Sequence, residues 1–192
     1  MNHYIERVVD LLDPATNDLY DLTTEQARAL LVQHAADAMQ QIEGSFALVA
    51  RSGKMVRMVR SLDRPMRYFL AKRTEGPVLI VADRIDAIYD WLKSEGLEAQ
   101  FHPSYTRMIP AHHVVDLQLI GCPDPDPVYT RFFTPEMATM EPDTQRIGER
   151  YIAALANEVS LWLDRVPAYD LSGSAFLEVS TAAVSSSPRI TS

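Results

Sequence analysis

The stretch from Gly44 to Asp83 limits most strongly what this chain can fold into. It contains four short runs rich in apolar and β-branched residues: GSFALVAR, KMVRMVRS, RYFLAK and PVLIVAD. Each run is too short for a stable helix, and turn residues separate the runs, which predicts consecutive strands. Ser52-Gly53-Lys54 is a hairpin signal because glycine reaches the backbone angles of a tight turn. The last run is almost wholly apolar, which predicts a buried strand.

Two segments that flank these runs have the spacing of amphipathic helices. LTTEQARALLVQHAADAMQQI begins with Thr23 and Gln26 at the two positions of a capping box. Its apolar stripe follows at helical spacing: Ala27, Leu30, Leu31, Ala35 and Met39. DRIDAIYDWLKSEG predicts a shorter helix that Gly96 ends. Its apolar face would hold Ile85, Ile88 and Leu92, with Trp91 beside them.

The remaining segments complete an α+β order of elements. TRMIPAHHVVDLQLI has strand character, and Pro110 marks an edge or a bend in it. We interpret GCPDPDPVYTRFFTPEMATMEPD as a proline-rich connector. Asp143 then caps a long helix that Pro167 ends. Its apolar stripe is Ile147, Tyr151, Leu155, Val159, Trp162 and Val166. The predicted order is therefore helix, four strands, helix, strands, linker, helix, which is typical of α+β folds.

Charge and cysteine content exclude several classes of function. The formal net charge of −8 is unfavourable for a nucleic-acid surface or an anionic membrane, so we expect neither partner. No apolar run reaches the roughly 20 residues of a membrane span, and the N-terminus lacks the layout of a secretion signal. The single cysteine, Cys122, cannot form an internal disulfide, which favours a cytoplasmic location.

The reactive side chains do not form a recognisable site at this level. His112 and His113 are adjacent, so on a strand they would point to opposite faces, and no cluster of ligands accompanies them. Cys122 lies in the connector without an activating group, and the SGS of residues 172–174 is too poor in glycine for a phosphate loop. We interpret the strand methionines as packing residues: Met55, Met58, Met66 and Met108. Both tryptophans, Trp91 and Trp162, lie on the apolar stripes of predicted helices, and we interpret them as core or interface anchors. We therefore assign no catalytic, cofactor-binding or metal-binding residue.

Several segments between residues 23 and 168 nevertheless occur in an order that a known family shares. They are IEGSFALVA, RSLDRPMRYFLA from Arg60, ADRIDAI from Ala82, IPAHHVV from Ile109, YTRFFTP, and the helix ending LWLDRVP. They resemble GxFAL, RDxxGxKPLYY, SE(I/M)KAL, PPGHYL, RYWxP and the helix before the ATP-pyrophosphatase loop of asparagine synthetases and β-lactam synthetases. The resemblance implies a class II glutamine-amidotransferase-like domain. Its fold would be a partial N-terminal-nucleophile-hydrolase sandwich of antiparallel strands with flanking helices, followed by one long C-terminal helix.

The departures from this family bear on activity. The family's glutaminase uses an N-terminal cysteine whose own α-amine serves as base, whereas Asn2 stands at that position here. The segment before the first predicted helix is too short for the strands that carry the family's glutamine-binding arginine and its NGE segment. The family's glutamine-contacting aspartate falls at Thr23, and its RD pair has become Arg60-Ser61. The resemblance therefore implies a domain that does not hydrolyse glutamine.

The end of the chain departs further. The family has SGGIDS shortly after the position of Val166-Pro167, where this chain has LSGSAFLEVSTAAVSSS. If the coding sequence slipped by one base near Asp170, the codons of residues 171–183 permit the reading PVGVCFSGGIDSG. That reading is the family's ATP loop in its expected place. We therefore expect a frameshift near Asp170 that truncates the chain before an ATP-pyrophosphatase domain.

These inferences define three regions and leave two classes of function open. Residues 1–135 would be a degenerate amidotransferase-like domain, residues 136–168 a linker and helix leading toward a missing synthetase domain, and residues 169–192 a disordered, out-of-frame tail. In the first class, the chain is the N-terminal fragment of an ATP-dependent, amide-forming ligase. Its intact relatives would use ATP and Mg²⁺ in asparagine biosynthesis, whereas this chain would bind no cofactor and be inactive alone. In the second class, it is a non-catalytic module that binds a partner ligase or itself, as a homo-oligomer through the exposed C-terminal helix.

Overall fold

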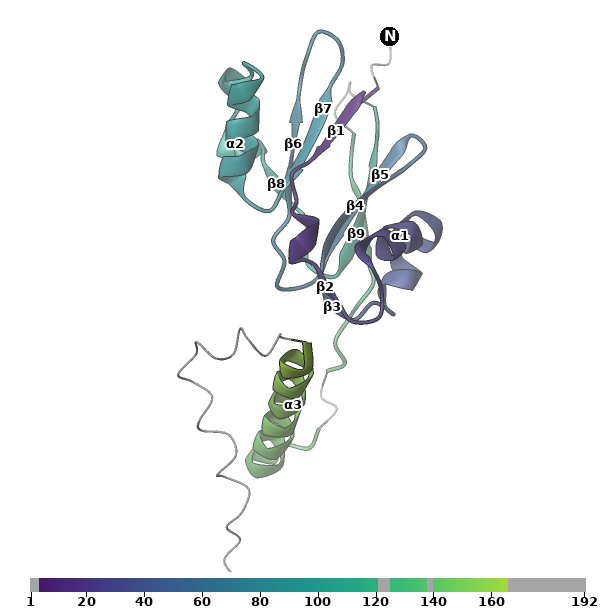
Figure 1. Cartoon of the computed structure of the whole chain (residues 1–192), viewed down its shortest axis with the longest axis vertical. Helices are drawn as coiled ribbons and strands as arrows, with labels where there is room; N and C mark the ends of the chain where they lie inside the picture. Colours follow the sequence, from purple (N-terminus) through teal and green to yellow (C-terminus); the bar gives the residue numbers. More distant parts are fainter. Residues whose placement is uncertain (1–3, 121–124, 138–139, 166–192) are drawn as a thin grey trace, which may run out of the picture. The chain divides into compact units, whose positions relative to one another are not determined.

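The computed structural model describes residues 4–120, 125–137 and 140–165, with the backbone alone at 34, 35 and 165. The chain divides into two compact units, Met1–Pro135 and Glu136–Ser192 (Figure 1). Strands and two helices make up the described part of the first unit, and one helix dominates that of the second. This is the mixed α+β composition, with antiparallel sheets and a C-terminal helix, that the sequence predicts.

Two four-stranded sheets form the centre of the N-terminal unit. The first has the order β1-β7-β6-β8, with bounds Arg7–Asp10, Val78–Ala82, Arg67–Ala71 and Arg107–Met108. The second has the order β10-β9-β5-β4, with bounds Val128–Arg131, His113–Gln118, Met55–Arg60 and Ala47–Ser52. A short pair joins β2, Asp18–Leu19, to β3, Gly44–Ser45. Every described pairing is antiparallel except that of β1 with β7, which is parallel.

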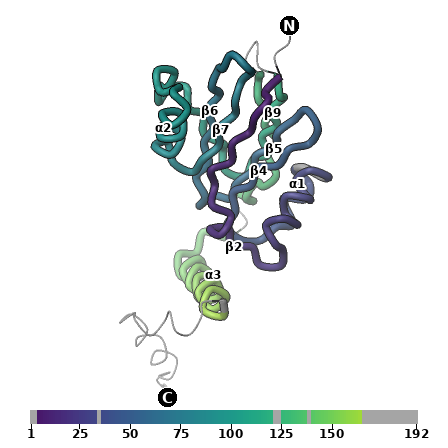
Figure 2. Tube along the Cα trace, turned by 45° about the horizontal axis from the view of Figure 1, so that its top comes forward, coloured from purple at the N-terminus to yellow at the C-terminus, as the bar shows by residue number. Residues whose placement is uncertain are grey.

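Three hydrophobic clusters join these sheets and their helices into four layers. Met58 and Tyr68 belong to the cluster that fills the space between the two sheets. Helix α1, Thr24–Met39, covers the outer face of the second sheet, where Leu31 packs in a cluster with Val59. Helix α2, Ile85–Ser94, covers the outer face of the first sheet through a cluster that includes Leu92. The layers therefore follow the order α1, sheet, sheet, α2, with the two helices on opposite sides (Figure 2).

The local signals in the strand block and in both flanking helices are confirmed. Ser52 pairs with Met55, so a two-residue loop closes the hairpin, and Gly53 has the φ of 60° that such a turn requires. The Thr23 hydroxyl accepts from the Gln26 amide at 3.2 Å while the Gln26 side chain accepts from the Thr23 amide at 2.8 Å. This reciprocal pair is the predicted capping box. Helix α2 ends as predicted, with a left-handed glycine at Gly96.

The predicted order of elements is wrong at two places. The predicted order begins with a helix, whereas β1 and β2 precede α1 in the structure. The segment predicted to be a connector contains β10. Strand β1 escapes recognition because its pairing is parallel to the distant β7, which leaves no hairpin signal nearby. All four residues of β10 are exposed, so the strand lacks the alternation of a half-buried edge. Backbone pairing with β9 alone defines it.

Pro110 lies where the chain passes from one sheet to the other, as the predicted bend requires. β8 pairs with β6 in the first sheet, whereas β9 pairs with β5 in the second. Residues 109–112 make this crossing. Of the predicted packing methionines, Met58 and Met66 are buried and Met55 is half-buried, but Met108 is 46% exposed, so that interpretation is wrong for Met108.

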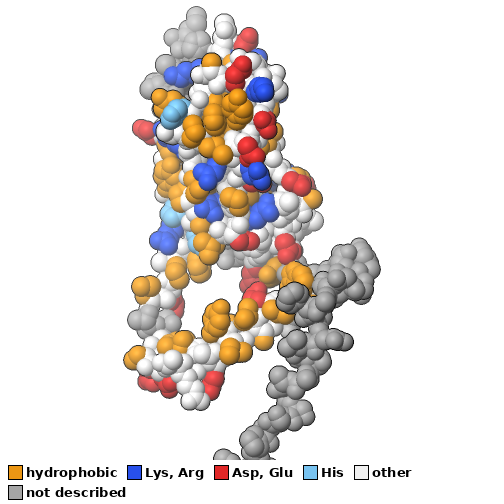
Figure 3. All heavy atoms as spheres, turned by 90° about the vertical axis from the view of Figure 1, so that its left-hand side faces the viewer, with side chains coloured by type: hydrophobic (Ala, Val, Ile, Leu, Met, Phe, Trp, Pro, Cys, Tyr) orange, Lys and Arg blue, Asp and Glu red, His pale blue; other side chains and the backbone are white. Residues whose placement is uncertain are grey.

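Helix α3, Thr144–Arg165, is the main described element of the second unit. Asp143 caps it as predicted, because its carboxylate accepts from the amides of Gln145 at 2.9 Å and Arg146 at 3.2 Å. The predicted apolar stripe is exposed: Ile147 42%, Tyr151 68%, Leu155 51%, Val159 47% and Trp162 50% (Figure 3). Val166 and Pro167 lie outside the described residues. Within the described part of the chain, no helix is long and apolar enough to cross a membrane.

Candidate functional site

One cavity of about 290 Å³ gathers residues from segments that lie far apart in the sequence. It lies where β4 begins, β5 ends, β9 begins and β10 ends, so all four strands of the second sheet contribute the same end. The end of α1 and the loop after it close one side. The lining residues are Met39, Gln40, Ile42, Glu43, Gly44, Phe46, Ser61, His112, Phe132 and Phe133. We call this cavity the motif cavity, because the segments GSFAL, RSLD, AHHVV and RFF all reach it.

Ser61 is the buried hydroxyl of the motif cavity, and both its donor and one of its acceptor positions are used. It accepts from the Phe46 amide at 3.0 Å and donates to Asp63 Oδ1 at 2.5 Å. Ser45 donates to the other oxygen of the same carboxylate. Burial acts to raise the pKa of Asp63, but the hydrogen bonds from Ser45 and Ser61 outweigh it and lower that pKa. Asp63 is therefore a poor proton acceptor, and Ser61 joins β4 to β5 without being activated as a nucleophile.

Arg60 precedes Ser61 and lies almost wholly buried at the end of β5. Its guanidinium donates to the carbonyl of Ile109 at 2.6 Å. It also donates to three carbonyls of the following turn, those of Ser61, Leu62 and Arg64, at 3.1 to 3.2 Å. Burial, together with the nearby Arg67, lowers the pKa of Arg60, while Asp63 opposes that shift. This arginine therefore holds the β5 turn to the chain that crosses between the sheets.

His112 is the titratable ring of the motif cavity. It has a φ of 58°, it precedes β9, and its main chain bonds the carbonyl of Arg60 and the amide of Phe132. Its ring lies 5.8 Å from that of Phe132 and 4.9 Å from that of Phe133. Burial first, and then the charges of nearby Arg131 and Arg60, lower the pKa of His112, so the ring is neutral at pH 7.

The histidine pair is arranged differently from the prediction. Only His113 belongs to a strand, and its Nδ1 lies 2.7 Å from the Ala111 carbonyl, whereas His112 is in a turn. Among the described residues, no three His, Cys, Asp or Glu side chains group as metal ligands would. Asn2, Cys122 and residues 172–174 lie outside the described residues. Thr23 caps α1 and does not line the motif cavity.

The lining aromatic residues appear in the sequence only as parts of motifs, and no site is predicted from them. Phe132 and Phe133 follow β10, a strand that the sequence does not reveal, so their position opposite Met39 could not be anticipated. The signal that was available is the order of the segments themselves. Comparisons with models of protein families and with curated proteins give no match, so neither comparison assigns the chain to a family.

Proposed function

We propose that residues 1–135 form an amidotransferase-like domain of the asparagine synthetase and β-lactam synthetase type that no longer hydrolyses glutamine. The observation that carries this proposal is the convergence of four motif segments on the motif cavity. All four segments lie at the same end of the second sheet, where segments of one domain would line a common site. The order of layers, helix, sheet, sheet and helix, also suits an N-terminal-nucleophile-hydrolase sandwich.

The chemistry of the motif cavity supports the absence of glutaminase activity. Hydrolysis through a covalent intermediate needs a nucleophile next to a base that can accept its proton. Among the described residues that line the motif cavity there is no thiol, and the Ser61 hydroxyl donates to Asp63, whose pKa is lowered. His112 is neutral, and its ring contacts the rings of Phe132 and Phe133, which carry no proton to transfer.

Two assays on the purified chain test this proposal. We expect neither glutamate release from glutamine nor ATP–pyrophosphate exchange above a buffer control. Turnover that survives repeated purification and disappears in His112→Ala would contradict the loss of glutaminase activity. A second test is the nucleotide sequence that encodes residues 165–192. Codons of residues 171–183 that cannot spell the ATP loop in the shifted frame would exclude the frameshift.

A second candidate function, self-association, rests on helix α3. Five apolar side chains along one stripe of α3 are each at least two-fifths exposed, so no other described residue of its own unit covers this apolar face. A second copy presents the same stripe, and two such helices bury both faces in one symmetric contact. We expect Leu155→Glu and Trp162→Glu to shift sedimentation from homomer to monomer. Asn157→Glu, on the opposite side of the helix, is the matched control, and a wild-type chain that sediments as a monomer refutes this candidate.

A further inference from the structure

Strand β6 has an incomplete edge, and this edge is separate from the motif cavity. Its neighbour β8 pairs Met108 with Arg67 and Arg107 with Tyr68, and then ends. If β8 began two residues earlier in the same register, Tyr105 would lie opposite Leu70. However, Pro103–Tyr105 forms a turn of 3-10 helix, so the chain leaves the edge before it reaches that position.

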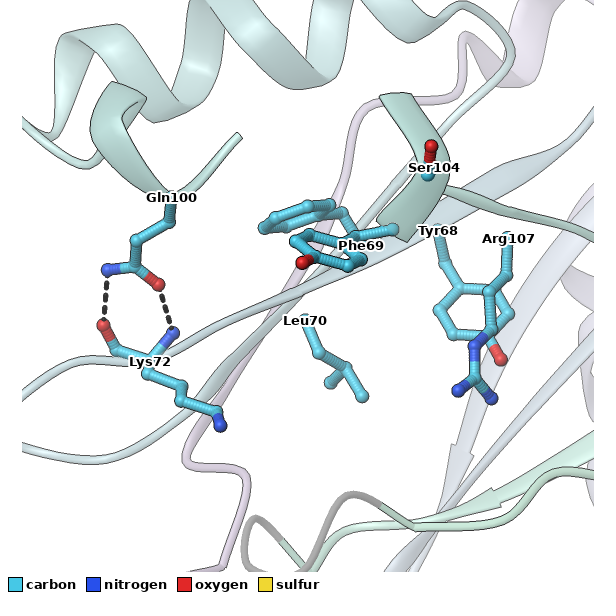
Figure 4. Close-up of a pocket in the computed structure, with 8 residues that line it drawn as sticks. Tyr68, Phe69, Leu70, Lys72, Gln100, Ser104 and Arg107 are labelled. Atoms are coloured by element: carbon cyan, nitrogen blue, oxygen red, sulfur yellow. Dashed lines mark hydrogen bonds between the residues drawn. The ribbon is translucent and has the colours of Figure 1, made fainter. Parts of the chain in front are cut away.

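Further along the same edge of β6, the Gln100 side chain pairs with the main chain of Lys72. The Lys72 amide donates to Gln100 Oε1 at 2.8 Å, and Gln100 Nε2 donates to the Lys72 carbonyl at 2.7 Å. The Gln100 amide therefore replaces a strand at this position (Figure 4). Main-chain pairing at Tyr68 and side-chain pairing at Lys72 leave Leu70 between them.

The register shows that the main-chain groups of Leu70 face this gap. The amides of Glu6 and Leu11 donate to the carbonyls of Pro77 and Val81, so alternate residues of β7 face β1 and the others face β6. Leu79, the register partner of Leu70, is in the set that faces β1. The N–H and C=O of Leu70 therefore point away from β7, toward the open edge. No hydrogen bond to either group forms among the described residues.

Leu70 is one of the residues that line a cavity of about 410 Å³. Lys72 and Arg107 place positive charge around it, and Phe69 and Tyr105 add aromatic surface. Figure 4 shows the Arg107 guanidinium beside the end of the Tyr68 ring, with Leu70 between this pair and the Lys72–Gln100 pair. Tyr68 is 1% exposed, and its hydroxyl makes no hydrogen bond of standard geometry within the described chain. Burial raises the pKa of Tyr68, whereas the nearby Arg107 acts to lower it.

We propose that this edge binds the carboxyl end of a short peptide or of an N-acylamino acid. The last residue of such a ligand adds to β6 in the direction of β8. Its N–H donates to the Leu70 carbonyl, and its carboxylate accepts from the Leu70 amide and faces Arg107. The acyl part then extends toward Lys72 and Gln100. A volume of about 410 Å³ holds a ligand of this size, whereas Gln100 blocks further pairing along β6.

The charge and the main-chain groups of the edge select this ligand over other classes. A neutral amide would satisfy Leu70 but would not use the positive charge that Arg107 and Lys72 place around the cavity. Sulfate would meet the charge but has no N–H or O–H to donate to the Leu70 carbonyl. A ligand with both an N–H and a carboxylate on one residue meets both requirements. This inference does not depend on the proposed function, because the two cavities share no lining residue.

Amide chemical shifts of the ¹⁵N-labelled full chain test the proposal, with acetyl-Ala-Ala as the probe. We expect saturable shifts at Leu70, Lys72, the Gln100 side chain and Arg107. The C-terminal methylamide of the probe should bind about tenfold more weakly, because a charge-assisted hydrogen bond is lost. Methylation of the nitrogen of the last residue should abolish binding. It removes the donor to the Leu70 carbonyl, and the added methyl group would lie where that hydrogen bond forms.

Variants and competing probes complete the experiment. Arg107→Gln should reduce affinity for the free acid to that for the methylamide, while Arg51→Gln, an exposed arginine outside the cavity, should not. A ten-residue peptide with the same last two residues distinguishes the sources: equal affinity identifies chain ends, and weaker binding identifies free short peptides. Absence of shifts at millimolar probe would overturn the proposal. So would equal binding of the N-methylated probe, or the same shifts with inorganic phosphate alone.

Discussion

Replacing Ser61 by alanine should destabilise the N-terminal unit far more than replacing Ser45, the other serine that donates to Asp63. Ser61 is 7% exposed, and it is the acceptor for the Phe46 amide at 3.0 Å. Alanine leaves this amide without a partner beside a Phe46 side chain that is only 2% exposed. An unsatisfied buried donor costs about 1–3 kcal/mol, and the lost bond to Asp63 adds about 1 kcal/mol after allowance for the exposure of that carboxylate. We expect a total of about 2–4 kcal/mol.

Ser45→Ala is the matched control for this prediction. Ser45 is half-buried and donates to the same Asp63 carboxylate, but its Oγ accepts no buried amide. Its loss should therefore cost less than about 1 kcal/mol. The assay is urea unfolding followed by Trp91 fluorescence in a Trp162→Phe background, which leaves one tryptophan in the N-terminal unit. Equal losses for the two serine variants, with unchanged dependence on urea, would refute the argument from the Phe46 amide.

Three further predictions concern stability. Gly44→Ala should cost at least about 3 kcal/mol in urea unfolding, because an added Cβ would lie 2.1 Å from the Asp18 carbonyl oxygen and φ is 121°. Gly53→Ala, at φ 60° with nothing within 4 Å, should cost only about 1 kcal/mol, and equal costs would contradict this account. Thr23→Ala should lower the thermal midpoint, because the variant loses about 1 kcal/mol of capping free energy. Thr23→Ser should retain most of that free energy. Because folding lowers the pKa of Asp63, its contribution is present above the unfolded pKa and is lost as pH falls through the folded pKa. Asp63→Asn should flatten acid unfolding in that range, and an unchanged acid transition would count against the Ser45 and Ser61 hydrogen bonds.

The sequence predicts those elements whose signals are local. The capping box at Thr23 and the turn at Gly53 lie next to the elements they define, so a short window contains all the information. Strand β1 is recognised only through its pairing with the distant β7. Strand β10 is recognised only through its pairing with β9, because all four of its residues are exposed. Periodicity therefore predicts the central block well and the edges of the sheets poorly.

The two candidate sites differ in how much of each can be predicted from the sequence. The segments of the motif cavity stand out in the sequence, but only the topology brings Ser61 and His112 to one end of the second sheet. The edge at Leu70 offers main-chain groups as its donor and acceptor. No residue type reports a free main-chain group, because the gap arises from the register of β8 and the turn at Pro103–Tyr105. In the sequence, Gln100 cannot be distinguished from an ordinary polar residue, because only the structure shows its hydrogen bond to the Lys72 carbonyl.

The parallel pairing of β1 with β7 also constrains the order of events when the chain folds. Strand β1 is near the N-terminus, but Arg7 has its register partner at Val78, on the far side of α1 and both hairpin strands. Closing so long a loop is entropically costly until the intervening hairpin has shortened it. Strand β1 precedes β7 along the chain, yet it should be among the last strands of the N-terminal unit to gain protection from hydrogen exchange. Until β7 has formed, the main-chain groups of residues 7–10 remain an unpaired strand edge that another chain can capture.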